Sequence, residues 1–146
     1  MIHLRAIDEE NFDACIKLKI KDSQSTYMAP NIYSFAQAWL YPALARPFAL
    51  YSDDTLVGFV MLEYDDTRKT CGIWRFMIGE HYQGRGYGKE ALLCVLTYIK
   101  ENPVFEAVTL SYEPENTVAE TLYRQFGFAP TGEMDGTQVI MKLSLR

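Results

Sequence analysis

Short apolar runs separated by polar turns make up the first half of the chain. Phe12, Ile16 and Ile20 recur every fourth residue, which is typical of the buried face of a helix. The run from Thr55 to Tyr64 is apolar at neighbouring positions, as in a strand that is buried on both faces. In chain order, this half is predicted to form a strand at 2–6, helices at about 9–20 and 33–41 with a loop over 21–33, and strands at 48–51, 55–64 and 70–78.

Two further helical patterns lie among strands in the second half. Asn116 is placed to cap the helix predicted to follow it, as Asp8 is in the first half of the chain. Gly127 follows that helix, at a position that favours a left-handed backbone. A strand on each side of a helix implies at least one parallel pair, so the fold class is mixed α/β. The predicted elements are helices over about 87–100 and 117–126 and strands at 106–112, 128–134 and 138–144, the last two joined by a turn at Asp135–Gly136.

Composition narrows the range of partners. The 146 residues fit a single domain over 1–146, and a formal charge of −5 argues against a nucleic-acid surface while it would help to attract a cationic substrate. Three cysteines without a C-x-x-C pair and only two histidines indicate reduced thiols and no metal site. Because no apolar run approaches ~20 residues, we expect no membrane span and a cytoplasmic location.

A glycine-rich segment carries the strongest chemical signal. Gln83-Gly84-Arg85-Gly86-Tyr87-Gly88 lies between a predicted strand and a predicted helix. Three glycines in five residues allow successive backbone N–H groups to turn toward one point, at the positive end of the helix dipole. Such a loop can bind a phosphate or pyrophosphate, with added charge from Arg85 and Lys89. The spacing is that of neither a Walker loop nor a dinucleotide fingerprint.

These residues resemble a known family. Gln83, Gly86 and Gly88 match the Q/R-x-x-G-x-G/A motif of the GNAT acetyltransferase superfamily. Downstream, the pattern N-x-x-A-x-x-L-Y-x-x-x-G-F is matched by Asn116, Ala119, Leu122, Tyr123, Gly127 and Phe128. The resemblance implies the GNAT fold: a twisted, mostly antiparallel sheet with one parallel strand pair and helices on both faces.

The resemblance also implies acetyl-CoA as cofactor and assigns residues to it. The backbone of Phe76, Met77 and Ile78 is expected to pair with the pantetheine arm like an added strand. The amides of residues 84–89 are expected to hold the pyrophosphate. Asn116 is expected to contact the pantetheine or the reactive end, and Tyr123 to reach the thioester sulfur.

The expected reaction is direct attack of a neutral amine on the acetyl group in a ternary complex. A phenol has a pKa of ~10 and a free thiol ~8.5, so Tyr123 could donate or share a proton as sulfur gains charge. A backbone amide near Ile78 could stabilise the oxyanion. Glu63, expected on a strand face shared with Met61 and partly buried, is the candidate base, with deprotonation through water as the alternative. We expect no route through a cysteine.

Within the superfamily, the chain resembles the small bacterial spermine/spermidine acetyltransferases. The residues that carry this resemblance are Asn31, Ser34, Ala36–Trp39, Gly58–Leu62 and Asp135–Gly136. A small cationic amine, above all a polyamine, is therefore the expected substrate. Candidate residues of the acceptor site are Asp22, Gln24, Tyr27, Tyr33 and Trp39. Carboxylates that could attract the amine, or simply be solvated, are Glu9, Glu10, Asp22, Glu63, Asp65, Asp66, Glu113 and Glu115.

Alternative functions remain open at the level of the sequence. The acceptor could be an amino sugar, an amino acid or a peptide N-terminus, and an acceptor with a carboxylate would favour Arg75, which is expected to face the same side as Ile73 and Met77. A non-catalytic acyl-CoA sensor would keep the glycine loop and could lose Tyr123, which is present. A homodimer could form through the edges of the final strands.

Overall fold

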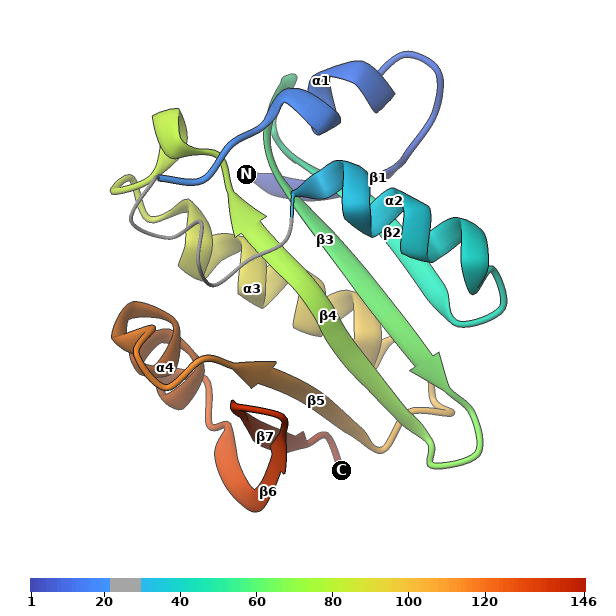
Figure 1. The fold of residues 1–146 in the computed structure, drawn as a ribbon, viewed down its shortest axis with the longest axis vertical. Coiled ribbons are helices and arrows are strands. Elements are labelled where there is room, and N and C mark those ends of the chain that lie inside the picture. Colours follow the sequence, from blue (N-terminus) through green and yellow to red (C-terminus); the bar gives the residue numbers. More distant parts are fainter. Residues whose placement is uncertain (22–29) are drawn as a thin grey trace.

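The computed structural model describes residues 1–21 and 30–146, so that Asp22, Gln24 and Tyr27 lie outside the described part. Seven strands form one sheet in the order β1-β2-β3-β4-β5-β7-β6 (Figure 1). The strands are β1 Ile2–Ala6, β2 Ala45–Ser52, β3 Thr55–Asp65, β4 Thr70–Ile78, β5 Ala107–Tyr112, β6 Ala129–Asp135 and β7 Gln138–Ser144. The helices are α1 Phe12–Lys17, α2 Asn31–Leu40, α3 Tyr87–Lys100 and α4 Thr117–Gln125, with a short 3-10 helix η2 at Glu80–Tyr82.

Every neighbouring pair of strands in this sheet is antiparallel except β4 and β5. The connection between those two contains α3, which returns the chain to the same end of the sheet, as a crossover helix does. The predicted mixed α/β class with one parallel pair is confirmed. Within the described residues, no helix has the length and the apolar character needed to cross a membrane.

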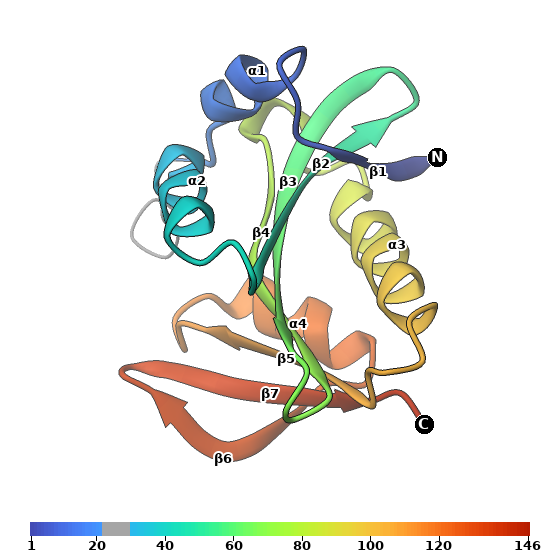
Figure 2. The same cartoon turned by 90° about the vertical axis from the view of Figure 1, so that its right-hand side faces the viewer.

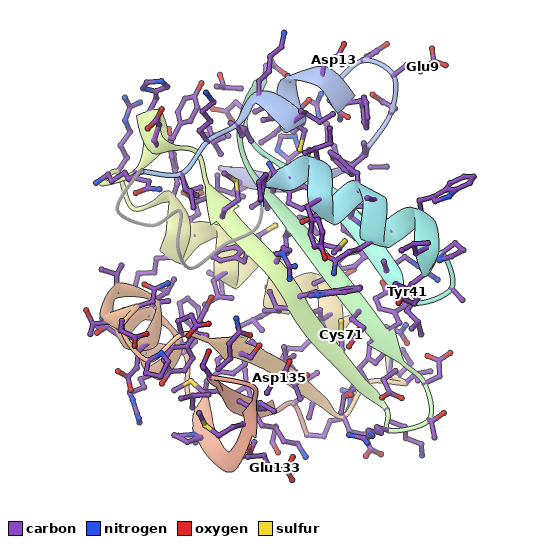
Figure 3. The ribbon with its side chains drawn as sticks, viewed as in Figure 1. Glu9, Asp13, Tyr41, Cys71, Glu133 and Asp135 are labelled. Carbon is purple, nitrogen blue, oxygen red and sulfur yellow. The ribbon has the colours of Figure 1, made fainter. Side chains whose placement is uncertain are left out.

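Helices cover both faces of the sheet. Figure 2 shows α1 and α2 on one side and α3 on the other. Under α1 and α2 lies a cluster that includes Phe59, Met61 and Met77, while a larger core that includes Leu92 and Tyr123 joins α3 and α4 to the opposite face. Charged groups such as Glu9, Asp13 and Glu133 are exposed, whereas Cys71 is buried within the sheet (Figure 3).

The first helix is shorter than its apolar spacing predicted. Asp8 Oδ1 accepts hydrogen bonds from the N–H groups of Glu10 (2.9 Å) and Asn11 (3.1 Å), so this predicted cap closes a turn just before α1. At the other end, Leu18 is already extended, and the carbonyl of Lys19 accepts a hydrogen bond of 2.6 Å from the N–H of Glu80. Pairing with a segment far along the chain, which helical periodicity does not reveal, therefore ends the helix.

β4 contains one residue more than the stretch of β3 with which it pairs. Arg75 lies opposite Met61 and Ile73 lies opposite Leu62, so that Trp74 between them has no partner. This is a β-bulge, and such an insertion changes which face of the sheet the following side chains occupy.

The bulge corrects one prediction. Ile73 packs in the core under α3, whereas Trp74 and Met77 pack in the cluster under α1 and α2. Arg75 shares the face of Met77, because it donates a hydrogen bond to Gln37 of α2. The prediction that Arg75 and Ile73 face the same side was wrong, since strict alternation along a strand fails at an extra residue.

β4 and β5 separate soon after they meet. Their parallel pairing covers only Thr70–Ile73 with Ala107–Leu110, and the two strands then diverge toward α4 (Figure 1). Beyond Ile73, β4 stays paired with β3 on its other side. Among the described residues, no strand pairs with the remaining edge of β4, so its backbone groups are available to a ligand.

Candidate active site

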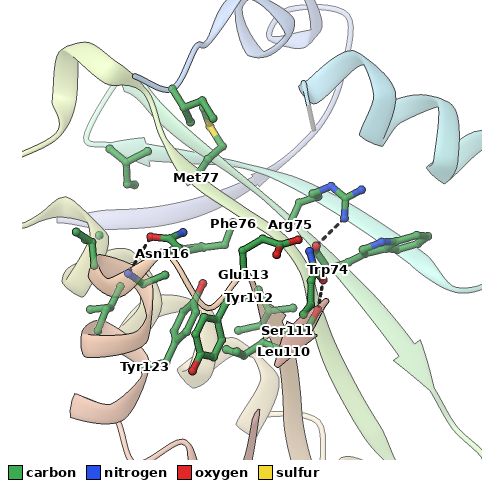
Figure 4. A pocket seen from close by; sticks show the side chains of 18 of the residues that line it. Trp74, Arg75, Phe76, Met77, Leu110, Ser111, Tyr112, Glu113, Asn116 and Tyr123 are labelled. Carbon is green, nitrogen blue, oxygen red and sulfur yellow. Dashed lines mark hydrogen bonds between the residues drawn. The ribbon is translucent and has the colours of Figure 1, made fainter. Parts of the chain in front are cut away.

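A cavity of about 950 Å³ opens where β4 and β5 separate. Side chains of β4 and of the segment from β5 to α4 meet across it (Figure 4). Residues of the glycine-rich loop, of β6 and of β7 also line it. The two sequence motifs that lie on either side of α3 are thus brought to one site.

The glycine-rich loop has the backbone that its composition predicted. Gly84 (φ 79°) and Gly86 (φ 81°) both have a left-handed backbone, and a Cβ atom at either would meet no heavy atom within 4 Å. Gly86 is also the N-cap of α3, so the free N–H groups of the first helical turn point away from the helix at this loop. Gln83 fixes the entry to the loop by donating a hydrogen bond of 2.9 Å from Nε2 to the Ile78 carbonyl.

The structure brings most of the predicted cofactor residues to the cavity wall. The predicted cofactor residues that line the cavity are Phe76, Met77, Ile78, Gln83, Gly84, Gly88, Asn116 and Tyr123. The predicted residues that lie on the loop or the first turn of α3 without lining the cavity are Arg85, Gly86, Tyr87 and Lys89. Tyr87 packs against the core instead, and Arg85 lies over the Tyr82 ring at 5.8 Å.

Tyr123 presents a buried phenol to this cavity. Its exposed fraction is 8%, and its ring packs against Phe128 and Tyr112 with centroid distances of 6.0 and 6.2 Å. Burial raises the pKa of Tyr123 to about 12, so the phenol keeps its proton at neutral pH. In the described part of the chain no group accepts a hydrogen bond from its hydroxyl, which can therefore donate to a ligand.

Asn116 combines a structural and a site position. Its Oδ1 accepts a hydrogen bond of 3.3 Å from the N–H of Ala119, which confirms the predicted cap of α4. Gly127 ends the same helix with φ 96°, as its position predicted. Because α4 is fixed at both ends, it holds Tyr123 and Asn116 together at the cavity.

Glu63 lines the cavity from β3, next to Gly72 of β4. Its side chain is exposed, so the expected partial burial is not observed. The missing side chain of Gly72 leaves this space open, because a Cβ atom there would lie 3.6 Å from that of Glu63. The position of Glu63 at the cavity thus agrees with a role toward a ligand, but burial does not set it apart from other surface carboxylates.

The described candidates for the acceptor site on α2 do not reach the cavity. Asn31, Ser34, Phe35 and Ala38 face inward from this helix. Tyr33 and Trp39 lie off that face, with exposed fractions of 55% and 84%, and neither lines the cavity. The packing of α2 on the sheet fixes which side chains of the helix face inward, and Tyr33 and Trp39 are not among them.

Arg75 of β4 is a basic group that lines the cavity. Its Nη1 donates to the Trp74 carbonyl (2.9 Å) and its Nη2 to Oε1 of Gln37 (3.0 Å), while Nε is buried without an acceptor. Burial lowers the pKa of Arg75, with Tyr33 acting in the opposite direction. No ion pair to Arg75 occurs within residues 1–21 and 30–146, so its charge is not balanced by a contacting carboxylate.

Sequence reasoning assigned no role to several residues that line the cavity. They come from β5 and the β6–β7 pair and are Thr109, Ser111, Tyr112, Asp135 and Gln138. Glu113, one of the candidate carboxylates, lines it as well. The polar residues at positions 109 and 111, in an otherwise apolar strand, were the sequence signal that could have identified them. Only the pairing of β5 with β7 shows on which side of the sheet they lie.

The chain is similar to known proteins over nearly its whole length. Residues 12–128 match the model of the acetyltransferase (GNAT) family. The chain is 32% identical to the probable spermine N(1)-acetyltransferase of Bacillus subtilis subsp. natto, with 97% of each chain covered. The spermine/spermidine N(1)-acetyltransferase of Bacillus subtilis strain 168 is also 32% identical, with the same coverage.

Solved structures with lower sequence identity share the fold. A spermidine N-acetyltransferase from Vibrio cholerae, solved with CoA and spermine, has a TM-score of 0.79 at 19% identity and covers 98% of this chain and 95% of its own. An N-acetyltransferase from Thermoplasma acidophilum, solved with coenzyme A, has a TM-score of 0.73 at 19% identity and covers 99% of both chains.

Proposed function

The chain belongs to the GNAT acetyltransferase family, and from this membership we propose that it transfers the acetyl group of acetyl-CoA to a primary amine of a polyamine. One observation carries the proposal: the free edge of β4, the glycine-rich loop and the buried phenol of Tyr123 meet in one cavity. The transfer would take place directly, with both substrates bound together.

The residues present fit acetyl-CoA. The unpaired edge of Phe76–Ile78 can accept the extended pantetheine arm by backbone hydrogen bonds. The left-handed glycines Gly84 and Gly86 and the start of α3 suit the pyrophosphate, with Arg85 and Lys89 nearby. When bound, the cofactor supplies an acetyl group activated as a thioester, and Asn116 would contact the arm near it.

We assign to Tyr123 the donation of a hydrogen bond to the departing sulfur. A phenol with a pKa of about 12 is a weaker acid than a thiol at ~8.5, so the complete transfer of its proton is unfavourable. A hydrogen bond still stabilises the charge that grows on sulfur. A backbone amide near Ile78 would serve the acetyl oxygen in the same way.

The carboxylates that line the cavity suit a cationic amine. Glu63, Glu113 and Asp135 line the cavity, and Trp74 adds an aromatic face that can attract an ammonium group. The two Bacillus subtilis relatives named for spermine, at 32% identity, support the same substrate class. Glu63 is the carboxylate that we propose as base, with transfer through water as the alternative.

The test is the release of free thiol from acetyl-CoA with spermine, spermidine, putrescine, lysine, an aminoglycoside and short peptides, for the wild type and for Tyr123→Phe. Saturable turnover of spermine or spermidine, strongly reduced by the substitution, is the expected result. Turnover of lysine or a peptide alone would overturn the polyamine assignment and favour an acceptor with a carboxylate, for which the unpaired Arg75 would be suited. Coenzyme A binding without any turnover would favour a sensor. The homodimer and the cytoplasmic location stay predictions.

A further inference from the structure

Along β4, Arg75 lies between residues that line two parts of the cavity. On one side, the lining consists of groups assigned to the cofactor, from Phe76–Ile78 to Tyr123. On the other side lie Glu63, Gly72 and the polar residues of β5 and β7. An amine that enters through this second part and attacks a thioester held in the first part therefore passes close to the guanidinium of Arg75.

Within residues 1–21 and 30–146, no carboxylate contacts this guanidinium, which lies over the Trp74 ring at 5.9 Å. Both hydrogen bonds that it donates go to neutral oxygens, the Trp74 carbonyl and the Gln37 amide. None of the ionisable groups around the cavity that the structure describes forms an ion pair with it. The groups that line the cavity are Lys21, Glu63 of β3, Tyr112 of β5, Glu113 after β5, Tyr123 of α4 and Asp135 of β6. Tyr33 of α2, which does not line the cavity, also acts on Arg75.

The reaction needs a neutral amine, and no carboxylate that lines the cavity in the described part of the chain is fully buried. An alkylammonium group has a pKa of ~10.4, so it is almost fully charged at neutral pH. Glu63, the candidate base, is exposed. A fixed positive charge nearby disfavours the charged form of an ammonium group, and like charges are known to activate amines in this way.

We propose that the unpaired guanidinium of Arg75 keeps the reacting nitrogen of the bound amine in its neutral form, while the carboxylates of the same cavity hold the remaining ammonium groups of a polyamine. The ammonium group loses one proton to solvent, directly or through Glu63, and Arg75 forms no bond and keeps its own proton. The inference rests on the proposed function in one respect, that the acceptor is an amine.

The first test is the pH dependence of kcat at saturating spermine. Removing the charge with Arg75→Gln should move the acid limb of kcat to higher pH by at least about one unit, because two charges several ångströms apart near a protein surface interact by at least that much. At neutral pH both kcat and KM should fall, because the ammonium form binds better and reacts less. The acid limb of kcat/KM, which reports free enzyme and free amine, should stay in place.

Two further variants separate charge from structure. Gln37→Glu places a carboxylate where Arg75 already donates a hydrogen bond, so it should neutralise the guanidinium and reproduce the shift with Arg75 in place. Gln125→Glu adds the same charge on the exposed end of α4 and should not shift the limb. Arg75→Lys keeps the charge and should keep the wild-type limb. Thermal unfolding shows whether Arg75→Gln is folded. If it is not, the acid limb of Gln37→Glu tests the role of the Arg75 charge.

The second readout needs no turnover. Spermine is titrated calorimetrically into the protein–coenzyme A complex near pH 9.5, in buffers of different ionisation enthalpy, to count the protons released. The wild type should release on the order of half a proton more than Gln37→Glu, given a one-unit change near the amine pKa.

Equal acid limbs and equal proton release in the wild type and Gln37→Glu would overturn the inference. So would an unchanged profile with spermine together with a selective loss of lysine turnover in Arg75→Gln, since the guanidinium would then recognise a carboxylate. If the wild type does not acetylate spermine, only the proposed function is contradicted. The role of Arg75 is then decided by the pH profile of kcat and the proton release measured with the amine that does react.

Discussion

Nη2 of Arg75 donates a hydrogen bond to Oε1 of Gln37 at 3.0 Å, and this contact joins the bulge of β4 to α2. The bond matters because the bulge alone does not fix a long side chain. With its Nη1 on the Trp74 carbonyl, the guanidinium is held in one orientation at the cavity wall. A change at Gln37 therefore acts on the cavity through Arg75, although Gln37 does not line it.

Gln37→Glu should stabilise the fold at neutral pH by about 1 kcal/mol, because an ion pair replaces a hydrogen bond from the guanidinium to a neutral amide. Urea unfolding measures the change. The gain should vanish when Arg75→Gln is also present, so a double-mutant cycle isolates the pair. A gain that survives in the double variant would show that the new carboxylate acts elsewhere.

Tyr123→Phe should lower kcat by roughly a hundredfold, the loss expected when one hydrogen-bond donor to a developing negative charge is removed, while coenzyme A still binds. Stability should change little, since no described residue accepts a hydrogen bond from this hydroxyl. Tyr112→Phe is the matched control, because its hydroxyl donates to Glu120 (3.1 Å) from a ring that packs against Tyr123. The release of free thiol from acetyl-CoA is measured for both variants. Equal decreases in kcat would contradict a special role of Tyr123.

Gly86→Ala should weaken coenzyme A binding on the order of tenfold, about 1.4 kcal/mol, because the left-handed backbone of the loop (φ 81°) is strained with a side chain. Gly132→Ala on β6 carries a similar strain (φ 89°) far from the loop in sequence and without lining the cavity. Calorimetric titration and thermal unfolding should show a comparable loss of stability in both variants and weaker binding only in Gly86→Ala.

Glu63→Gln should lower kcat by less than about tenfold, because an exposed carboxylate gives less than the hundredfold or more of a tuned base. KM for spermine should rise as one attraction is lost. Glu133→Gln, also exposed but outside the cavity lining, is the control (Figure 3). A loss of a hundredfold or more in kcat for Glu63→Gln alone would instead make Glu63 the base.

The stability of the fold should decrease above pH 9. Burial raises the pKa of Cys15 and of Cys71 from 9.0 to about 12, with Glu63 adding to the shift at Cys71. The unfolded chain then loses these protons first, so stability present below pH 9 is lost as pH rises toward 12, by up to about 1.4 kcal/mol per pH unit for each thiol. Urea unfolding at pH 8 and 10.5 measures the decrease. Cys15→Ala should reduce it, and an unchanged slope would contradict this account.

Much of the fold could be read from local signals. The bounds of β4 and the start and end of α3 were predicted correctly, because apolar spacing and the glycines on each side are strong. The cap at Asn116 and the left-handed turn at Gly127 are equally local, since each depends on a few neighbouring residues. The glycine-rich loop was found for the same reason.

Other features depended on contacts between distant segments. The early end of α1 follows from the pairing of Lys19 with Glu80, and the exposure of Trp39 follows from how α2 packs on the sheet. The bulge at Trp74, which turns Arg75 toward α2, exists only in the pairing of β4 with β3.

By itself, then, the sequence determined the order of the elements, the glycine-rich loop with its left-handed backbone, and the position of Tyr123 on a capped helix. These features depend on backbone preferences and side-chain spacing over a few residues. Only the tertiary structure decided that β4 and β5 separate beyond Ile73, that Tyr112 and Glu113 line the cavity, and that Arg75 lines it with its guanidinium hydrogen-bonded to Gln37. Strand pairing and packing, which sum many weak contacts between distant segments, set those positions.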